Sequence, residues 1–146
     1  MTRTSASATI RRPIADVFAV LTDVEQSGTW FPGDIEERWT SPPPHGLGST
    51  RHATVRAMGR TTENDAIVTA YEPPHLAAMR GTTKGAEFDA TLRFTETGDV
   101  TRVDVAIDLP GRGAQRLVMP LFARWYGTQW QRGLVTLTQM MESGEL

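Results

Sequence analysis

The sequence AQRLVMPLFARWYGTQWQRGLVTLTQMME, residues 114–142, is the segment around which we expect the rest of this chain to assemble. As one helix, its roughly 29 residues would extend about 43 Å. Its apolar side chains form two stripes, Val118, Phe122 and Trp125, flanked by Leu117 and Leu121, and then Tyr126, Trp130, Leu134, Leu137 and Met141. Spacings of three and four residues are typical of a helix that is buried on one side. The segment therefore predicts a long C-terminal helix, laid across another layer so that it closes a cavity.

The start of this helix is less well defined than its end. Residues 111–116 contain no Ser, Thr, Asp or Asn that would serve as an N-terminal cap. Pro120 costs about 3 kcal/mol in the interior of an ideal helix. Either the helix begins near Met119, with Pro120 in its first turn, or it is kinked at Pro120. We favour the kink, which would turn the first half of the helix away from the sheet, near the mouth of a cavity.

The chain before this helix alternates apolar and polar residues, and it predicts strands. We expect strands at residues 3–10, 35–40, 49–58, 61–71, 76–80, 87–95 and 102–109. Between the first two strands, Ile14, Val17, Phe18 and Leu21 predict a short helix, and Asp23 is expected to cap a second helical turn. Short connections predict antiparallel hairpins. Strands with one apolar face predict a sheet that is covered on one side only.

Composition excludes several classes of protein. The chain has 146 residues, 39% hydrophobic and 22% charged, with a formal net charge of −2, which gives no electrostatic case for nucleic-acid binding. It has no Cys, and this excludes disulfides and thiolate chemistry. The N-terminus lacks the apolar core of a signal peptide, and no apolar run is long enough to cross a membrane. We expect a cytoplasmic protein, and the sequence leaves its oligomeric state open.

Several segments occur in an order that carries a family resemblance. After the opening strand come RPIADVFAVLTDVEQSGTWFP (12–32), MGR (58–60), VTAYEPP (68–74), GDVTRV (98–103) and LVTLTQMME (134–142). Together they resemble the START/Bet v 1-like (SRPBCC) superfamily, in particular its bacterial polyketide cyclase/dehydrase branch. The resemblance covers nearly the whole chain and implies a single domain, residues 1–146.

The fold implied by this resemblance is α+β and is called a helix-grip. A curved antiparallel sheet of about seven strands wraps around the long C-terminal helix, two short helices follow the first strand, and an apolar cavity lies between sheet and helix. Members of the superfamily bind lipids, sterols, polyketides, quinones or plant hormones. A few catalyse cyclisation, aromatisation or dehydration, and others act on protein partners. Fold alone does not decide among these functions.

Aromatic side chains are the first candidates for a binding site. Trp30, Phe31, Trp125, Tyr126 and Trp130 form either an aromatic wall for a flat ligand or the packed core, since large aromatics dominate cores. Other apolar candidates for the wall are Phe122 on the helix and Phe88, Ala90 and Leu92 on the apolar face of one strand. Trp39, beside charged residues on a short strand, is left unassigned.

Three polar side chains are candidates for fixing a ligand. Arg51 and His52 are neighbours on one strand, so one of them points inward, and the apolar residues that share the parity of Arg51 favour Arg51. An inward Arg would bind a carboxylate, phenolate or carbonyl oxygen, whereas the alternative for either residue is a surface ion pair. Gln129 lies on the stripe of Phe122 and Trp125, where its amide needs a partner from a ligand, water or strand backbone.

Other titratable groups give little support for catalysis. The three histidines are far apart and show no metal-ligand spacing, so we expect no metal and no cofactor. Glu63 and Asp65 share a strand face that is expected to be solvated, and Asn64 takes the opposite face. No nucleophile or phosphate-binding motif is present.

Three hypotheses follow. The first is a protein that binds a small hydrophobic molecule in an internal cavity. The second is a metal-independent enzyme of the cyclase, aromatase or dehydratase type, which requires a titratable side chain beside open volume in the cavity. The third is a protein-interaction module, which requires a large exposed apolar patch.

Overall fold

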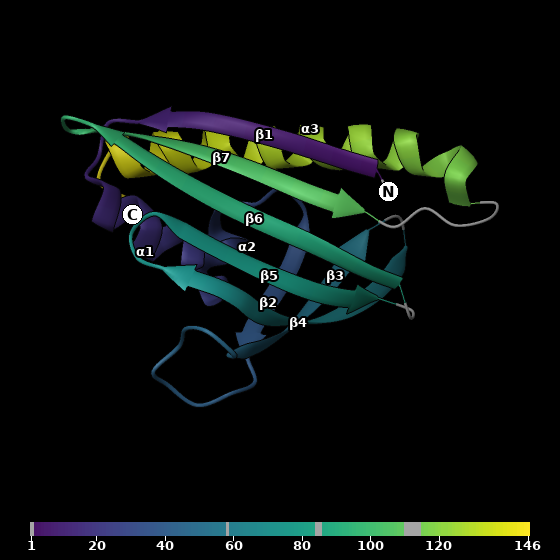
Figure 1. Cartoon of the computed structure of the whole chain (residues 1–146). Helices are drawn as coiled ribbons and strands as arrows, with labels where there is room; N and C mark the ends of the chain where they lie inside the picture. The colour runs from purple at the N-terminus through teal and green to yellow at the C-terminus, as the bar shows by residue number, and fades with distance from the viewer. Residues whose placement is uncertain (1, 58, 84–85, 110–114) are drawn as a thin grey trace.

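The computed structural model describes residues 2–57, 59–83, 86–109 and 115–146, and it combines one curved sheet with a long helix and a short helical segment (Figure 1). The strands are β1 (Thr2–Ile10), β2 (Asp34–Trp39), β3 (Thr50–Ala57), β4 (Arg60–Glu72), β5 (Leu76–Thr83), β6 (Ala86–Thr97) and β7 (Val100–Leu109). The helices are α1 (Ile14–Thr22), the single 3-10 turn η1 (Val24–Gln26), α2 (Ser27–Trp30) and α3 (Gln115–Glu142).

Each strand pairs antiparallel with its neighbours, in the order β1-β7-β6-β5-β4-β3-β2. The consecutive strands β1 and β2 therefore lie at opposite edges, and the segment α1-η1-α2 that joins them crosses one face of the sheet. Helix α3 runs along β1, in the same direction as that strand (Figure 1). The expected α+β helix-grip architecture, with a curved antiparallel sheet and a long C-terminal helix, is confirmed.

Most predicted boundaries differ from the observed ones by one to three residues. Asp23 caps η1 as expected, because its carboxylate accepts a hydrogen bond from the backbone N–H of Glu25. Helix α3 continues through Pro120, so a start near Met119 is wrong. Met58 at the end of one predicted strand, Ala114 at the predicted helix start and the capping residues sought at 111–114 lie outside the described residues.

The second apolar stripe of α3 is the main seam of the core. Leu134, Leu137 and Met141 are at most 1% exposed. They belong to one cluster with residues of β1, α1 and the inward face of β7, of which Ile10, Val17 and Val103 are fully buried. The alternation predicted for residues 102–109 accounts for the contribution of β7, because every second side chain of this strand is buried.

The described residues of the first stripe of α3 are not buried as predicted. The side chain of Val118, the first residue of this stripe, lies outside the described part of the structure. Phe122 and Trp125 are each 45% exposed, and the flanking Leu117 and Leu121 are more exposed still. The reason is the length of the neighbouring strand. Gly127 of α3 already lies against Thr4, near the beginning of β1, so the preceding helical turns extend past the end of the sheet (Figure 1).

The contact between α3 and β1 is unusually close at Gly127. A Cβ atom at this position would lie 2.2 Å from Oγ1 of Thr4, far inside van der Waals contact. One turn further on, the side-chain amide of Gln131 donates to the carbonyl oxygen of Ser7 at 2.8 Å and accepts from its N–H at 3.1 Å. Gln131, which the helical pattern places on the polar side, thus binds the sheet.

The outer face of β3 and β4 carries a small cluster of charges. Nδ1 of His52 lies 2.8 Å from Oδ1 of Asp65, and Nε2 lies 3.4 Å from Oε1 of Glu63. The hydrogen bond with Asp65 is the main cause that raises the pKa of His52 above its ordinary value, with a further contribution from Glu63. Glu63 and Asp65 are solvated, as predicted.

The packing seam predicts the effect of a cavity-creating substitution. Leu137→Ala should lower the free energy of unfolding by about 2–5 kcal/mol, because Leu137 is fully buried. Val135→Ala on the exposed side of the same helix is the matched control, and it should change stability by less than about 1 kcal/mol. Urea denaturation of the wild type and both variants measures the difference, and equal losses would contradict the packing described above.

The cluster on the outer face predicts a pH dependence. The pKa of His52 is higher in the folded protein than in the unfolded chain, where it is about 6.5. The interaction of protonated His52 with the two carboxylates therefore stabilises the fold fully at pH values below about 6.5. This contribution is lost as the pH rises through the folded-state pKa. In an NMR titration the His52 ring should titrate above pH 6.5 in the wild type and lower in Asp65→Asn. Asp89→Asn, on another strand pair, should leave the midpoint unchanged, and an unaltered midpoint in Asp65→Asn would contradict the assignment.

Candidate functional site

A cavity of about 600 Å³ lies between the sheet and the helical segments. Side chains from α1, η1, α2, β2 to β7 and α3 contribute to its wall. Its apolar lining includes Leu21, Val24, Ile35, Val55, Val68, Met79, Leu92 and Ile107 together with Ala53, Ala77, Ala78 and Ala90. These four alanines leave space on the strands where larger residues would fill the core.

Seven of the eleven residues predicted for the site line this cavity, namely Trp30, Phe31, Arg51, Phe88, Ala90, Leu92 and Tyr126. The ring of Phe88 lies over Gly81 of the neighbouring strand, where a Cβ atom would be 2.2 Å from the ring. Glycine at this position therefore lets Phe88 lie close to the sheet and form part of the wall.

The other four predicted residues do not line the cavity. His52 points to the outer face, where it meets Glu63 and Asp65, because its neighbour Arg51 takes the inward position. Phe122 and Trp125 lie on the part of α3 that extends past the sheet, and Gln129 on the following turn is also outside the lining. Phe122, Trp125 and Gln129 thus do not face this cavity, and among the described side chains of α3 only those of Tyr126 and Trp130 reach it.

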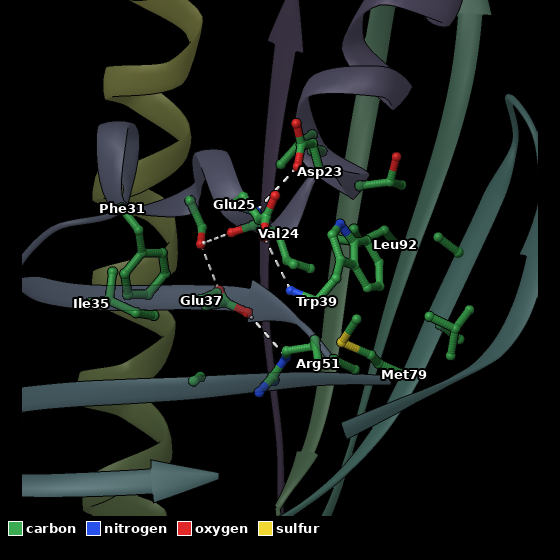
Figure 2. Close-up of a pocket in the computed structure, with 18 of the residues that line it drawn as sticks. Asp23, Val24, Glu25, Phe31, Ile35, Glu37, Trp39, Arg51, Met79 and Leu92 are labelled. Carbon is green, nitrogen blue, oxygen red and sulfur yellow. Dashed lines mark hydrogen bonds and ion pairs between the residues drawn. The ribbon is translucent and has the colours of Figure 1, made fainter. Parts of the chain in front are cut away.

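The polar centre of the cavity wall is an ion pair between β2 and β3. Nε of Arg51 lies 3.0 Å from Oε2 of Glu37, and the two side chains are 7% and 14% exposed. The N–H of Nε does not meet hydrogen-bond geometry, so the contact is mainly electrostatic. In Figure 2 the two side chains face each other from neighbouring strands, with Phe31 and Ile35 to one side and Met79 and Leu92 to the other.

Two further residues hold this ion pair in place. Nη1 of Arg51 donates to the side-chain oxygen of Asn64 and lies 3.4 Å from its backbone carbonyl oxygen. The hydroxyl oxygen of Ser27 lies 2.7 Å from Oε1 of Glu37 and 2.6 Å from the carbonyl oxygen of Val24. Both charged groups therefore have neutral hydrogen-bonding neighbours, which buried charges require.

The strand register explains how these groups meet. Ala53 of β3 pairs with Glu37 of β2 on one side and with Asn64 of β4 on the other. Arg51 lies two residues before Ala53, on the same face of β3. Arg51 therefore reaches both partners diagonally, a distance that long side chains span. Ala53 is 1% exposed, and its small side chain leaves the guanidinium room between Glu37 and Asn64.

Aromatic residues form the part of the wall nearest α3. Trp30, Phe31 and Trp130 contact one another with ring centroids 5.2 to 5.9 Å apart, and Phe31 also contacts Tyr126. The indole N–H groups of Trp30 and Trp130 make no hydrogen bond within the described residues. Part of the Tyr126 ring borders the cavity, yet protein atoms surround the phenol, and this burial raises its pKa. Tyr126 is therefore protonated at neutral pH.

A more polar part of the wall is formed by η1 and the loop after β2. Asp23 accepts hydrogen bonds from the N–H of Glu25 and the side chain of Gln26. Glu25 in turn accepts from the backbone N–H of Trp39 at 3.3 Å (Figure 2). The Trp39 ring stacks on His45 at 4.1 Å between centroids. This part places carboxylates and a flat aromatic pair beside the apolar space.

Glu37, Asn64, Ser27 and Trp39 were not predicted as site residues. Strict alternation along β2 was a usable signal for two of them, because Ile35, Glu37 and Trp39 are the less exposed residues of that strand and all line the cavity. The inward face of Asn64 followed from its position between Glu63 and Asp65. Its bond to Arg51 depends on the strand register, which the sequence does not give.

The described residues contain no group of three or more His, Cys, Asp or Glu side chains that could hold a metal ion. Among the same residues, no helix is long and apolar enough to cross a membrane.

Solved structures of other proteins share the fold of this chain. The structure superimposes on the Zhui aromatase/cyclase from Streptomyces sp. R1128 with a TM-score of 0.77 and 14% identity, covering 95% of this chain and 94% of that one. It superimposes on protein CV1439 from Chromobacterium violaceum with a TM-score of 0.75 and 12% identity, covering 96% and 97%. At such identities the likeness concerns the fold alone.

Sequence comparison gives the family. An uncharacterised protein of Mycobacterium tuberculosis is 30% identical over 100 residues, which are 66% of this chain and 68% of the relative. A family model described as polyketide cyclase/dehydrase and lipid transport matches residues 1–142. With its curved sheet, long C-terminal helix and hollow core, the chain belongs to the polyketide cyclase/dehydrase and lipid transport family.

Proposed function

We propose that this protein binds a small hydrophobic molecule in the cavity between the sheet and α3. The observation that carries the proposal is the cavity itself, about 600 Å³ of space with a mainly apolar wall. Pockets for small molecules commonly have volumes of about 300–1,000 Å³ and combine apolar walls with a few polar groups. Lipid-, polyketide- and quinone-like molecules fit this description, and the family description names both polyketide chemistry and lipid transport.

The shape of the wall supports a flat or elongated occupant. Trp30, Phe31 and Tyr126 present aromatic surface on one side, and Ala90 and Leu92 present aliphatic surface on β6. Aromatic rings favour stacked and edge-to-face contacts with other rings. The ion pair of Glu37 and Arg51 on β2 and β3 adds a fixed polar group to this mainly apolar wall, and this group would orient a bound ligand.

A catalytic role is the alternative that a specific observation favours. Asp23, Glu25 and Glu37 are titratable side chains in the cavity wall, which is the condition for an enzyme of the cyclase or dehydratase type. A binding protein would return its ligand unchanged, whereas an enzyme would convert it. Mass spectrometry of the ligand before and after incubation separates these two functions.

The third hypothesis, a protein-interaction module, is based on exposed apolar residues of α3. Leu117, Leu121, Phe122 and Trp125 are exposed near the beginning of this helix. Exposed apolar residues are compatible with a partner surface, but the cavity accounts for more features of the molecule, including the alanine-rich strand faces.

The binding proposal predicts the effect of filling the cavity. Ala90→Trp places a large ring in the open volume and should abolish binding of the neutral fluorescent probe N-phenyl-1-naphthylamine, whose fluorescence rises in apolar surroundings. Thr95→Trp on the exposed face of the same strand is the matched control and should bind the probe like the wild type. Circular dichroism checks that both variants fold.

Native mass spectrometry of the purified wild type should also detect a small molecule that is lost on denaturation. Wild-type protein that binds neither the probe nor any co-purified molecule would overturn the proposal. Undiminished probe binding in Ala90→Trp would place the binding site elsewhere.

A further inference from the structure

The described residues of the cavity wall hold more negative than positive charge. Among them are three carboxylates, those of Asp23, Glu25 and Glu37, and one guanidinium, that of Arg51. His45, also in the wall, stacks on Trp39 and has Nε2 3.2 Å from the carbonyl oxygen of Ser41. Arg51, the one permanent cation among the described lining residues, is therefore outnumbered by carboxylates.

Arg51 is also already paired. Its Nε faces Glu37 at 3.0 Å, and its Nη1 donates to Asn64. The sequence alone predicted that an inward Arg51 would bind a ligand carboxylate or another ligand oxygen. In the structure, the carboxylate of Glu37 already occupies that position beside Arg51. Glu37 in turn is held by Ser27, so the ion pair is fixed from both ends.

This arrangement opposes anionic ligands. A ligand carboxylate near Arg51 would also meet Glu37, and it could replace Glu37 only by leaving a buried carboxylate without its cation. An uncharged ligand avoids this cost, because it leaves the ion pair intact and places its apolar surface against the rest of the wall.

We infer that the cavity selects uncharged hydrophobic molecules over anionic ones, and that Glu37 determines this specificity by neutralising Arg51 within the wall. The inference rests on the proposed binding function and narrows its ligand class, since it separates neutral esters, ketones, quinones and alcohols from free fatty acids and other carboxylates.

Two matched probes test the inference by displacing N-phenyl-1-naphthylamine at neutral pH. They are methyl 2-naphthoate, which is uncharged, and 2-naphthoate, which is an anion. The wild type should bind the ester at least about tenfold more tightly than 2-naphthoate, because only the anion competes with Glu37 for Arg51. Ala90→Trp shows whether displacement occurs in the cavity.

Glu37→Gln tests the role of the carboxylate. The amide keeps the shape of the side chain, and its N–H can donate to the hydroxyl oxygen of Ser27, so the local hydrogen bonds are retained. With Arg51 no longer neutralised, affinity for 2-naphthoate should rise about tenfold, while affinity for the ester stays within about threefold. Glu36→Gln removes the neighbouring exposed carboxylate of β2 and should change neither value.

The outcomes separate the two proposals. If no probe binds the wild type, including N-phenyl-1-naphthylamine, the binding function fails and this inference fails with it. If the probes bind but 2-naphthoate binds the wild type as tightly as the ester, only the inference is overturned. Unchanged affinity for 2-naphthoate in a folded Glu37→Gln variant also overturns it. If the Glu37→Gln variant does not fold, the affinities of the wild type for the ester and for 2-naphthoate decide whether the inference holds.

Discussion

The packing of one half of α3 against the sheet is the constraint on which the other features depend. Leu134, Leu137 and Met141 are buried with Ile10 and residues of β7, so the end of the helix is fixed to one edge of the sheet. Burial of this kind is the main source of stability in a domain of this size. Because α3 packs along β1 at this edge, the strands beyond β7 lie further from the helix, and a cavity of about 600 Å³ remains between the sheet and the helical segments.

Within that space, the protein maintains a buried ion pair in an apolar wall. Such a pair costs desolvation energy and is a weak source of stability. In this fold its neighbours limit the cost, since Ser27 and Asn64 supply hydrogen-bonding atoms to Glu37 and Arg51. The same neighbours fix the position of the charges. The proposed selection against anionic ligands depends on this fixed position of the two charges beside the open volume.

The sequence predicted the architecture well because periodicity reports directly on burial. Alternation in residues 102–109 and the spacing of Leu134, Leu137 and Met141 both correspond to buried faces. The same reasoning misplaced Phe122 and Trp125, since a helical stripe indicates which side is apolar but not how far the neighbouring sheet extends. Likewise, parity placed Arg51 inward and Asn64 on the face opposite Glu63, yet it could not reveal that Glu37 and Asn64 both pair with Ala53. The long connection between β2 and β3 hides that register from sequence.

The contact of Gln131 with Ser7 has a consequence for how this molecule meets others. Strand β1 is the last strand on its side of the sheet, and its free N–H and C=O groups would otherwise offer a template for a strand from another chain. The Gln131 amide occupies both groups of Ser7. At the opposite edge, Glu25 accepts from the N–H of Trp39 on β2. Side chains from the protein's own helical segments thus protect both borders of the sheet at these positions against association through added strands.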